Sequence, residues 1–410
     1  MDFSHKLRLK SPPTTLTHRK RHSPITHPLN HQLPIASPST LSSKFKSFSV
    51  SSSLNSQLSS FIMSKFSKKR DIEGVSEELN LIASQNLDHA PARRLVRSAF
   101  VEAQRQLDHP LFKWAPTGIT TQEWYERNSR GLEIFLKSWM PPSEVVIKGA
   151  VFISHGYGDT CTFFMDGIAR RIAASGYAVY ALDHPGFGLS QGLHGYIPDF
   201  EYLVDNVMEQ YTTIKGRPEL KGLPCFLLGQ SMGGAVTLKV HLKDSHAWDG
   251  MILIAPMCRI AEDVKPPPLV LKAVTCLSRV LPKAKLVPQK DLSELFIRDL
   301  KTRKMAEYNV ISYNSLMRLK TAVELSKATE DIEARLEKVS APLLIIHGAA
   351  DKVTDPQVSQ FLYERASSKD KTLKLYEEGY HCILEGEPGD IIFGIFDDIV
   401  SWLDFRCSTD

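Results

Sequence analysis

Ser231 has the sequence context of a catalytic nucleophile. Four apolar residues typical of a strand precede its turn, and a helix-like run begins directly after it. The spacing Gly229-x-Ser231-x-Gly233 fits a strand–turn–helix motif that exposes a serine hydroxyl above a sheet. Larger side chains at the two glycine positions would collide in so tight a turn. The bare pattern arises by chance in about one chain in ten of this length, so the prediction depends on its context and on partner residues.

A serine nucleophile needs a base that accepts its proton and a carboxylate that orients the base. After a motif of this kind the carboxylate comes next in the chain and the histidine last, each in a loop that follows a strand. Asp351 follows the strand-like run 343–346, and His381 follows the run 372–376. The competing carboxylate is Asp355, but it precedes a proline and is typical of a helix N-cap. The predicted triad is therefore Ser231, Asp351 and His381.

The same chemistry needs two N–H groups that stabilise an oxyanion. One comes from the residue after the nucleophile, and the other from a loop after an early strand. We expect Met232 to supply the first and Tyr157, in the segment 151–158, to supply the second. His155 and Gly156 belong to this second loop. Because His155 precedes the serine in the chain, we expect its ring to brace the loop by hydrogen bonding.

The elements that must position these residues alternate between strand and helix. The runs 120–127 and 132–139 flank a turn and predict an antiparallel hairpin. The alternation that follows is typical of a mostly parallel sheet with helices on both faces, and one long helical insertion, at about 258–330, interrupts it. The later strands are expected at 150–154, 178–182, 225–228, 251–254, 343–346 and 372–376, and helices at 164–174, 200–214, 232–243, 357–366 and 391–405.

Charge is unevenly distributed over the 410 residues. Residues 1–70 hold twelve Lys and Arg and one acidic residue, a net charge of +11, whereas the other 340 residues carry 38 basic and 45 acidic groups, a net charge of −7. The overall charge of +4 therefore does not indicate a nucleic-acid partner, and we expect none. The six cysteines never have C-x-x-C spacing, which favours free thiols in a reducing compartment.

The N-terminal segment has the composition of a targeting peptide. Residues 1–70 contain 22 Ser and Thr, and they lack the continuous apolar stretch of a secretory signal. We predict a disordered, transit-peptide-like leader over 1–65, with its boundary between about Ser51 and Arg70, and hence a chloroplast location. The alternative is a disordered tail on a cytoplasmic protein. A helical extension is expected over 71–108.

Four segments of the chain carry a family resemblance: His155-Gly-Tyr-Gly-Asp159, Leu182-Asp-His-Pro-Gly-Phe-Gly-Leu-Ser190, Gly229-Gln-Ser-Met-Gly-Gly234 and His347-Gly-Ala-Ala-Asp-Lys-Val-Thr-Asp355. They resemble the monoacylglycerol lipase group of α/β-hydrolases, and within it the plant members that include caffeoylshikimate esterases. The resemblance runs from about Pro110 to Asp404. It implies an α/β-hydrolase fold over 110–407 with a helical cap at about 258–330. It also implies the triad and oxyanion-hole residues named above.

The expected activity is that of a serine esterase or lipase that hydrolyses lipid monoesters such as monoacylglycerol through an acyl-enzyme. The same triad would serve a hydroxycinnamoyl (caffeoylshikimate-type) esterase, a lysophospholipase or an acyltransferase, and a hormone receptor on this fold would not be an enzyme. No segment has metal-ligand spacing or a dinucleotide-binding loop, so we expect no metal and no cofactor. Glu385, Glu387 and Asp390 are expected in the first turns of the last helix.

The insertion contains an apolar stripe that indicates which chemical class of substrate to expect. Within 269–281 apolar residues recur at helical spacing. One interpretation is a cap helix that covers an acyl site and contacts a membrane or micelle surface. The other is a cap helix packed on its own domain. Both favour a small-molecule ester with an apolar or aromatic acyl group. The stripe consists of Leu269 or Val270, Ala273 or Val274, Leu277, and Val280 or Leu281.

Overall fold

The structure is a computed structural model, and it describes residues 71–260, 267–287 and 293–408. The predicted leader, residues 1–65, lies outside the described residues, as do 261–266 and 288–292 of the predicted cap. No helix within the described ranges is both long enough and apolar enough to cross a membrane.

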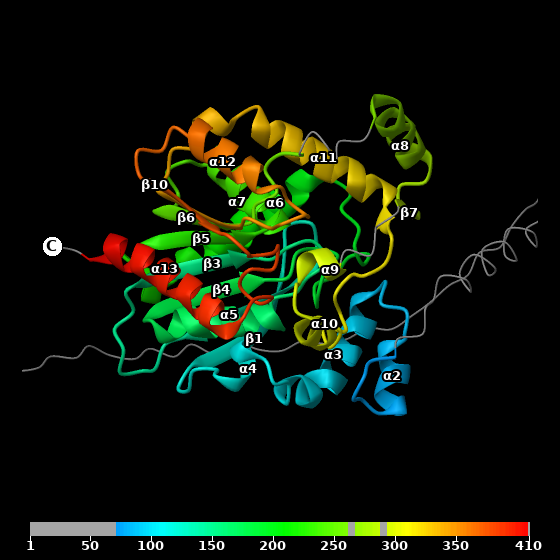
Figure 1. Cartoon of the computed structure of the whole chain (residues 1–410), viewed down its shortest axis with the longest axis horizontal. Helices are drawn as coiled ribbons and strands as arrows, with labels where there is room; N and C mark the ends of the chain where they lie inside the picture. The colour runs from blue at the N-terminus through cyan, green and yellow to red at the C-terminus, as the bar shows by residue number, and fades with distance from the viewer. Residues whose placement is uncertain (1–70, 261–266, 288–292, 409–410) are drawn as a thin grey trace, which may run out of the picture. The chain divides into compact units, whose positions relative to one another are not determined.

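Eight strands form one sheet in the order β1-β2-β4-β3-β5-β6-β9-β10 (Figure 1). All neighbours from β4 to β10 are parallel, whereas β1, β2 and β4 pair antiparallel. The strands β3, β4, β5, β6 and β9 are buried along their whole length, as expected for parallel strands covered on both faces. The predicted mostly parallel sheet is thus confirmed. The strands are β1 (Thr120–Arg127), β2 (Glu133–Met140), β3 (Gly149–Ser154), β4 (Tyr177–Leu182), β5 (Cys225–Gln230), β6 (Gly250–Ile254), β9 (Leu343–Gly348) and β10 (Lys371–Tyr376).

Helices cover both faces of this sheet (Figure 1). One apolar core lies between the sheet and α6, α7, α11 and α12, and a second lies between the opposite face and α3, α4, α5 and α13. Two short 3-10 helices are η1 (Pro218–Leu220) and η2 (Leu336–Lys338). The α-helices outside the cap are α2 (Glu77–Ala83), α3 (Ala90–Arg105), α4 (Pro110–Lys113), α5 (Phe164–Ala174), α6 (Phe200–Lys215), α7 (Met232–Lys243), α12 (Pro356–Arg365) and α13 (Gly389–Cys407).

The helices α2, α3 and α4 precede the sheet and are joined to it by a buried arginine. Arg93 of α3 is completely buried, and its guanidinium donates hydrogen bonds to the carbonyl oxygens of Leu87, Gly188 and Ser190. Burial lowers the pKa of Arg93 to about 10. The loop after β4 is therefore fastened to α3 by Arg93, and the neighbouring Arg94 adds a hydrogen bond from Nε to the Leu189 carbonyl at 3.0 Å.

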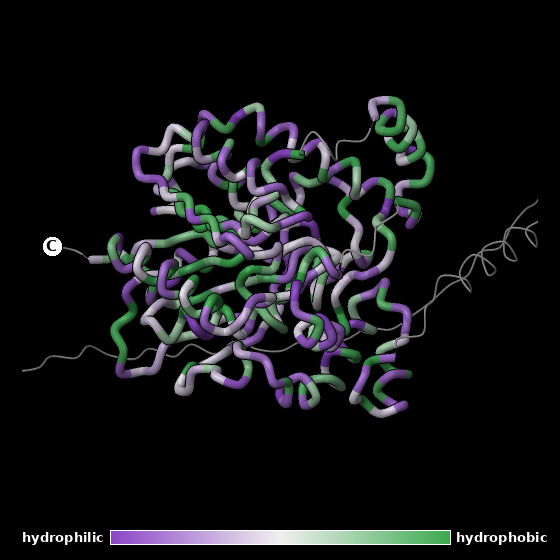
Figure 2. Tube along the Cα trace, viewed as in Figure 1, coloured by the Kyte–Doolittle hydropathy of each residue, from purple (hydrophilic) through white to green (hydrophobic). Residues whose placement is uncertain are grey.

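The cap segment, residues 258–330, separates β6 from β9. Its helix α8 projects from the rest of the fold, and Figure 2 shows many hydrophobic residues along it. The residues of α8 that are half-buried or buried include Leu271, Val274 and Ser278, and the neighbouring helix is α11. The cap segment contains α8 (Pro268–Val280), β7 (Lys285–Val287), α9 (Ser293–Phe296), α10 (Leu300–Ala306), β8 (Met317–Arg318) and most of α11 (Leu319–Glu333), the helix that also covers the sheet.

Most of the predicted apolar stripe of α8 is exposed. Five of its members are between 41% and 80% exposed. Ala273 is also exposed, and Val274 is half-buried. Of the two interpretations drawn from the sequence, packing on its own domain holds for one face of α8, because Val274 is half-buried, Ser278 is buried and α11 is the neighbouring helix. Most of the predicted stripe takes no part in this packing. The exposed members are Leu269, Val270, Leu277, Val280 and Leu281.

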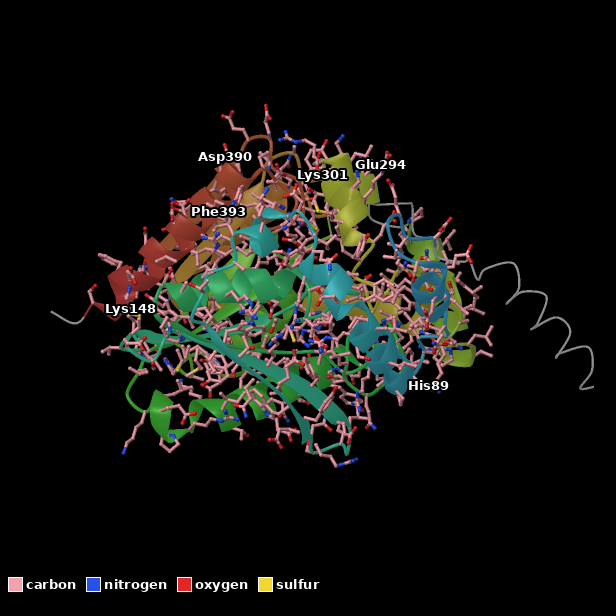
Figure 3. All side chains as sticks on the ribbon, turned by 90° about the horizontal axis from the view of Figure 1, so that it is seen from below. His89, Lys148, Glu294, Lys301, Asp390 and Phe393 are labelled. Atoms are coloured by element: carbon pink, nitrogen blue, oxygen red, sulfur yellow. The ribbon has the colours of Figure 1, made fainter. Side chains whose placement is uncertain are left out.

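The last helix, α13, packs along the sheet and anchors the C-terminal part of the fold. Figure 3 shows Lys148 beside its C-terminal end, where the ammonium group lies 2.8 Å from the Asp404 carboxylate. The hydroxyl of Tyr177 donates to the same carboxylate at 2.6 Å. Toward the N-terminal end of α13, Ile392 and Ile395 are buried in the core. Helix α13, which follows the loop that carries His381, is thus held near both of its ends.

Candidate active site

Ser231 sits in a strained turn between β5 and α7. Its backbone angles are φ 54° and ψ −117°, a conformation that residues with side chains rarely adopt. A Cβ atom on Gly229 would lie 2.4 Å from the carbonyl oxygen of Gly233, and a Cβ on Gly233 would lie 1.9 Å from that of Ser154. Glycine is therefore required at both positions, because strand and helix backbones meet there.

The structure brings Ser231, His381 and Asp351 together from three separate loops. The Nε2 atom of His381 lies 3.0 Å from Ser231 Oγ, and its Nδ1 atom lies 2.7 Å from Asp351 Oδ2. His381 and Asp351 are 1% and 6% exposed, whereas Ser231 is partly exposed. The competing carboxylate, Asp355, accepts the backbone N–H of Gln357 at 2.8 Å and caps α12. The geometry is that of a nucleophile, a base and an orienting carboxylate.

Asp351 has two further side-chain partners that sequence reasoning missed. His347 Nε2 lies 3.0 Å from Asp351 Oδ2, and the hydroxyl of Thr354 donates to the same oxygen at 2.8 Å. The Ser359 hydroxyl lies 2.6 Å from the other ring nitrogen of His347. Burial opposes ionisation of Asp351, but the hydrogen bonds from His347 and His381 outweigh it and hold the pKa of Asp351 well below its usual range. A histidine four residues before the carboxylate, at the end of β9, was the available sequence signal.

Two backbone N–H groups are open for an oxyanion. Within the part of the chain that the structure describes, neither Tyr157 nor Met232 uses its backbone N–H in a hydrogen bond. The loop of Tyr157 lies against the nucleophile, since a Cβ atom on Gly156 would be 3.4 Å from the Cβ of Ser231. The ring of His155 bridges this loop, because Nδ1 lies 2.8 Å from the Gly156 carbonyl oxygen and Nε2 accepts the N–H of His184 at 3.0 Å.

The cap segment holds the same loop from the other side. Tyr313 donates its backbone N–H to the Gly158 carbonyl at 2.7 Å, and Asn309 donates from Nδ2 to Asp159 at 2.9 Å. Burial raises the pKa of Tyr313 to about 12 and also raises that of Asp159. The tyrosine hydroxyl therefore stays neutral beside the site. The cap thus fixes the loop that presents the Tyr157 N–H.

An aromatic residue of the cap also contacts the base. The ring of Phe296 in α9 lies edge-on to the His381 imidazole, with ring centroids 5.1 Å apart. The Phe296 carbonyl accepts the N–H of Cys382 at 3.0 Å. Burial raises the pKa of the Cys382 thiol well above its usual range, so this thiol is not a second nucleophile. Phe296 thus places an aromatic ring beside His381, and the rings of Tyr157 and Tyr313 lie edge to face with centroids 5.9 Å apart.

The acidic residues before α13 have a different position from the one predicted. The helix begins at Gly389, so Glu385 and Glu387 lie in the preceding loop, where both are buried. Their placement in the first helical turns was wrong, and only Asp390 is found there. The described residues contain no group of three or more His, Cys, Asp or Glu side chains that could hold a metal ion.

The chain is similar in sequence and in fold to several known proteins. Residues 146–389 match the family described as serine aminopeptidase, S33 (Hydrolase_4). The chain is 34% identical to caffeoylshikimate esterase of Arabidopsis thaliana, over 70% of this chain and 86% of that protein. It is 30% identical to monoglyceride lipase of Homo sapiens, over 69% of this chain and 90% of that protein. A soluble variant of monoglyceride lipase from Saccharomyces cerevisiae, solved with a substrate analog, matches with a TM-score of 0.62 and 21% identity, over 72% of this chain and all of that chain. The predicted α/β-hydrolase fold is confirmed.

Proposed function

The chain belongs to the Hydrolase_4 family and is a serine hydrolase of carboxylic esters. From this premise we propose that Ser231, His381 and Asp351 perform the hydrolysis. The observation that carries the proposal is the continuous set of contacts from Ser231 Oγ through the imidazole of His381 to Asp351 Oδ2, at 3.0 and 2.7 Å. The strained backbone of Ser231 adds independent support.

Each residue has a defined role in this mechanism. Ser231 Oγ attacks the ester carbonyl carbon while His381 Nε2 accepts the hydroxyl proton, and the carbonyl oxygen becomes an oxyanion held by the N–H groups of Tyr157 and Met232. The ester C–O bond then breaks, and His381 returns the proton to the departing alcohol. Water, deprotonated by His381, attacks the acyl-enzyme, and Ser231 leaves with the proton. Asp351 stabilises the imidazolium in both half-reactions.

We propose lipid monoesters, such as monoacylglycerols, as the substrates. Monoglyceride lipases are among the relatives of the chain, and a substrate with a long acyl chain partitions into membranes or micelles. The exposed stripe of α8 offers an apolar surface for contact with such an interface, and Lys272 and Arg279 are exposed polar neighbours on the same helix. A lipid-surface role of α8 therefore forms part of this proposal.

A second candidate substrate class is the hydroxycinnamoyl esters. It is favoured by the 34% identity to caffeoylshikimate esterase and by the aromatic rings of Phe296, Tyr157 and Tyr313 beside the base and the oxyanion loop. The test is a comparison of kcat/KM for monoacylglycerols, lysophospholipids and hydroxycinnamoyl esters, with and without an added acceptor alcohol. A preference for monoacylglycerols with water as acceptor supports the first proposal. Faster acyl transfer to the alcohol would instead identify an acyltransferase.

We also propose that residues 1–65 direct the chain to the chloroplast. The support is the composition of this segment, with a net charge of +11 and 22 Ser and Thr within residues 1–70. A reporter fused to residues 1–70 should enter plastids, and cytosolic reporter signal would contradict the proposal. Removal of the segment should leave esterase activity unchanged.

A further inference from the structure

Behind the triad, a buried carboxyl group joins the loop of the base to the turn of the nucleophile. Glu385 lies four residues after His381 and is 5% exposed. Its Oε1 atom accepts a hydrogen bond from Nε2 of Gln230 at 2.8 Å. Gln230 directly precedes Ser231 and is the last residue of β5. The contact therefore connects two loops that must stay in register for proton transfer.

The N-terminal helices reach the same residue from outside the matched family region. His109, which is completely buried at the start of α4, donates from Nε2 to the backbone carbonyl of Glu385 at 2.8 Å. The direction of this hydrogen bond is fixed, because Nδ1 of His109 accepts the N–H of Leu111 at 3.2 Å and Nε2 therefore carries the proton. Burial lowers the pKa of His109, which favours the neutral ring that this arrangement requires. Glu385 is thus held through its main chain and its side chain at once.

If Glu385 is ionised, the contact between its carboxylate and the Gln230 amide lacks the proton for a second hydrogen bond. Its Oε2 atom and the Oε1 atom of Gln230 are both buried, and neither has a hydrogen-bond partner among the described residues. A carboxylate cannot donate to an amide oxygen, whereas a neutral carboxylic acid can donate from one oxygen while it accepts at the other. A neutral Glu385 would therefore form a two-point pair with the Gln230 amide and satisfy both orphan atoms.

The surroundings of Glu385 favour the neutral acid. Burial, and to a smaller degree the nearby Asp159 carboxylate, raise the pKa of Glu385 to about 7. Interactions with the Gln230 amide, the Cys382 thiol and the Leu384 backbone N–H oppose this rise but do not cancel it. The facing groups are Gln230 from β5, Asp159 from the loop after β3, His109 from α4 and Cys382 from the same loop. None of these groups supplies a positive charge, because the His109 ring is neutral and the Cys382 thiol stays protonated.

We propose that Glu385 is a positioning residue for the reaction at Ser231 and that it works as a neutral carboxylic acid paired with the side-chain amide of Gln230. The inference rests on the proposed role of Ser231, His381 and Asp351. Loss of the proton would remove one of the two hydrogen bonds and leave an anion in contact with Gln230, the residue that precedes the nucleophile. That charge would loosen the contact and disfavour the developing oxyanion.

The test is the pH profile of kcat for Glu385→Gln and Glu385→Ala, measured with a soluble chromogenic ester from about pH 6 to about pH 9. In the wild type, kcat should fall by about tenfold between about pH 7 and about pH 8.5, as expected for one ionisation. Glu385→Gln keeps a neutral two-point pair, so it should have wild-type kcat at low pH and lack this alkaline fall. Glu385→Ala should lower kcat throughout with little change in KM.

A matched control is Glu378→Gln, which removes an exposed carboxylate of the same loop that pairs with Arg298. Its profile should equal that of the wild type. A wild-type kcat that stays flat above about pH 7, an unchanged alkaline fall in Glu385→Gln, or a Glu385→Gln enzyme that is folded but inactive at every pH would overturn the inference. If Glu385→Ala does not fold, the Gln variant alone decides. Ser231→Ala gives the background rate, and retained turnover there would contradict the proposed function itself.

Discussion

The Nε2 atom of His347 lies 3.0 Å from Asp351 Oδ2, the same oxygen that accepts the hydrogen bond from His381. The two histidines approach this carboxylate from the end of β9 and from the loop after β10. Because both donate to one buried oxygen, Asp351 is held as an anion in a fixed orientation. The base of the proposed triad therefore depends on a carboxylate that is itself oriented by a second histidine.

The choice of carboxylate gives the first prediction. Asp351→Asn should lower kcat by about 10³- to 10⁴-fold, because an amide cannot hold the imidazole in the required tautomer. Asp355→Asn should change kcat by less than about threefold, since asparagine caps a helix as well as aspartate does. Steady-state kinetics of the two purified variants provide the measurement. Greater damage from Asp355→Asn would mean that the wrong carboxylate has been assigned.

The low pKa of Asp351 gives the second prediction, on stability. A carboxylate whose pKa is lower in the folded state stabilises the fold at pH values above its unfolded pKa of about 3.9. That contribution is lost as the pH falls toward the folded pKa. Asp351→Asn should therefore be less stable than the wild type at about pH 6, and the difference should shrink toward about pH 3. Urea unfolding across this range would measure it, and a gap that widens at low pH would contradict the assignment.

The third prediction separates surface contact from packing in α8. Val280 is 76% exposed, so Val280→Glu should leave the free energy of unfolding within about 0.5 kcal/mol of the wild type. It should weaken binding to lipid vesicles and lower kcat/KM for long-chain esters only. Val274 is half-buried, and Val274→Glu should destabilise the fold by about 1–3 kcal/mol.

Thermal melts, vesicle sedimentation and a series of acyl chain lengths would measure these effects. Unchanged vesicle binding and chain-length preference in Val280→Glu would show that the exposed stripe of α8 does not recognise lipid.

The fourth prediction concerns the N-terminal helices. Arg93→Met should lower the free energy of unfolding by about 2–4 kcal/mol, because several buried carbonyl groups lose their donor. Arg93→Lys should restore little of this loss, since an ammonium group cannot match the planar fork of a guanidinium. Exchange of the exposed Arg105 for Met is the control and should be neutral. A stable Arg93→Met variant would show that this side chain does not fasten the helices to the fold.

Much of the architecture could be predicted from the sequence because it depends on local patterns. Apolar runs between helices predicted the parallel sheet, and the glycine spacing around Ser231 indicated a tight turn. The carboxyl ends of parallel strands meet at one edge of the sheet, so Asp351 and His381, in the loops after β9 and β10, can reach the turn that carries Ser231. These inferences needed no knowledge of which distant side chains touch.

The rest of the site depends on contacts that local patterns do not contain. Gln230 and Glu385 are 155 positions apart, and their contact exists only after β5 and the loop before α13 are placed together. Acidic residues near a helix start are usually solvated, so the burial of Glu385 could not be predicted from its neighbours. The sequence shows a histidine at position 347, near the end of β9. Its contact with Asp351 Oδ2 depends on the path of the loop after β9, which the sequence pattern does not contain.

The central claim is that Ser231 is the nucleophile, and Ser231→Ala tests it most directly. Initial rates for a soluble short-chain chromogenic ester should be measured for the wild type and the variant, with a thermal melt of each. We expect kcat of Ser231→Ala to fall by at least about 10³-fold, because only oxyanion-hole and binding effects would remain, and we expect an undiminished Tm. Turnover close to that of the wild type in a folded Ser231→Ala protein would contradict it.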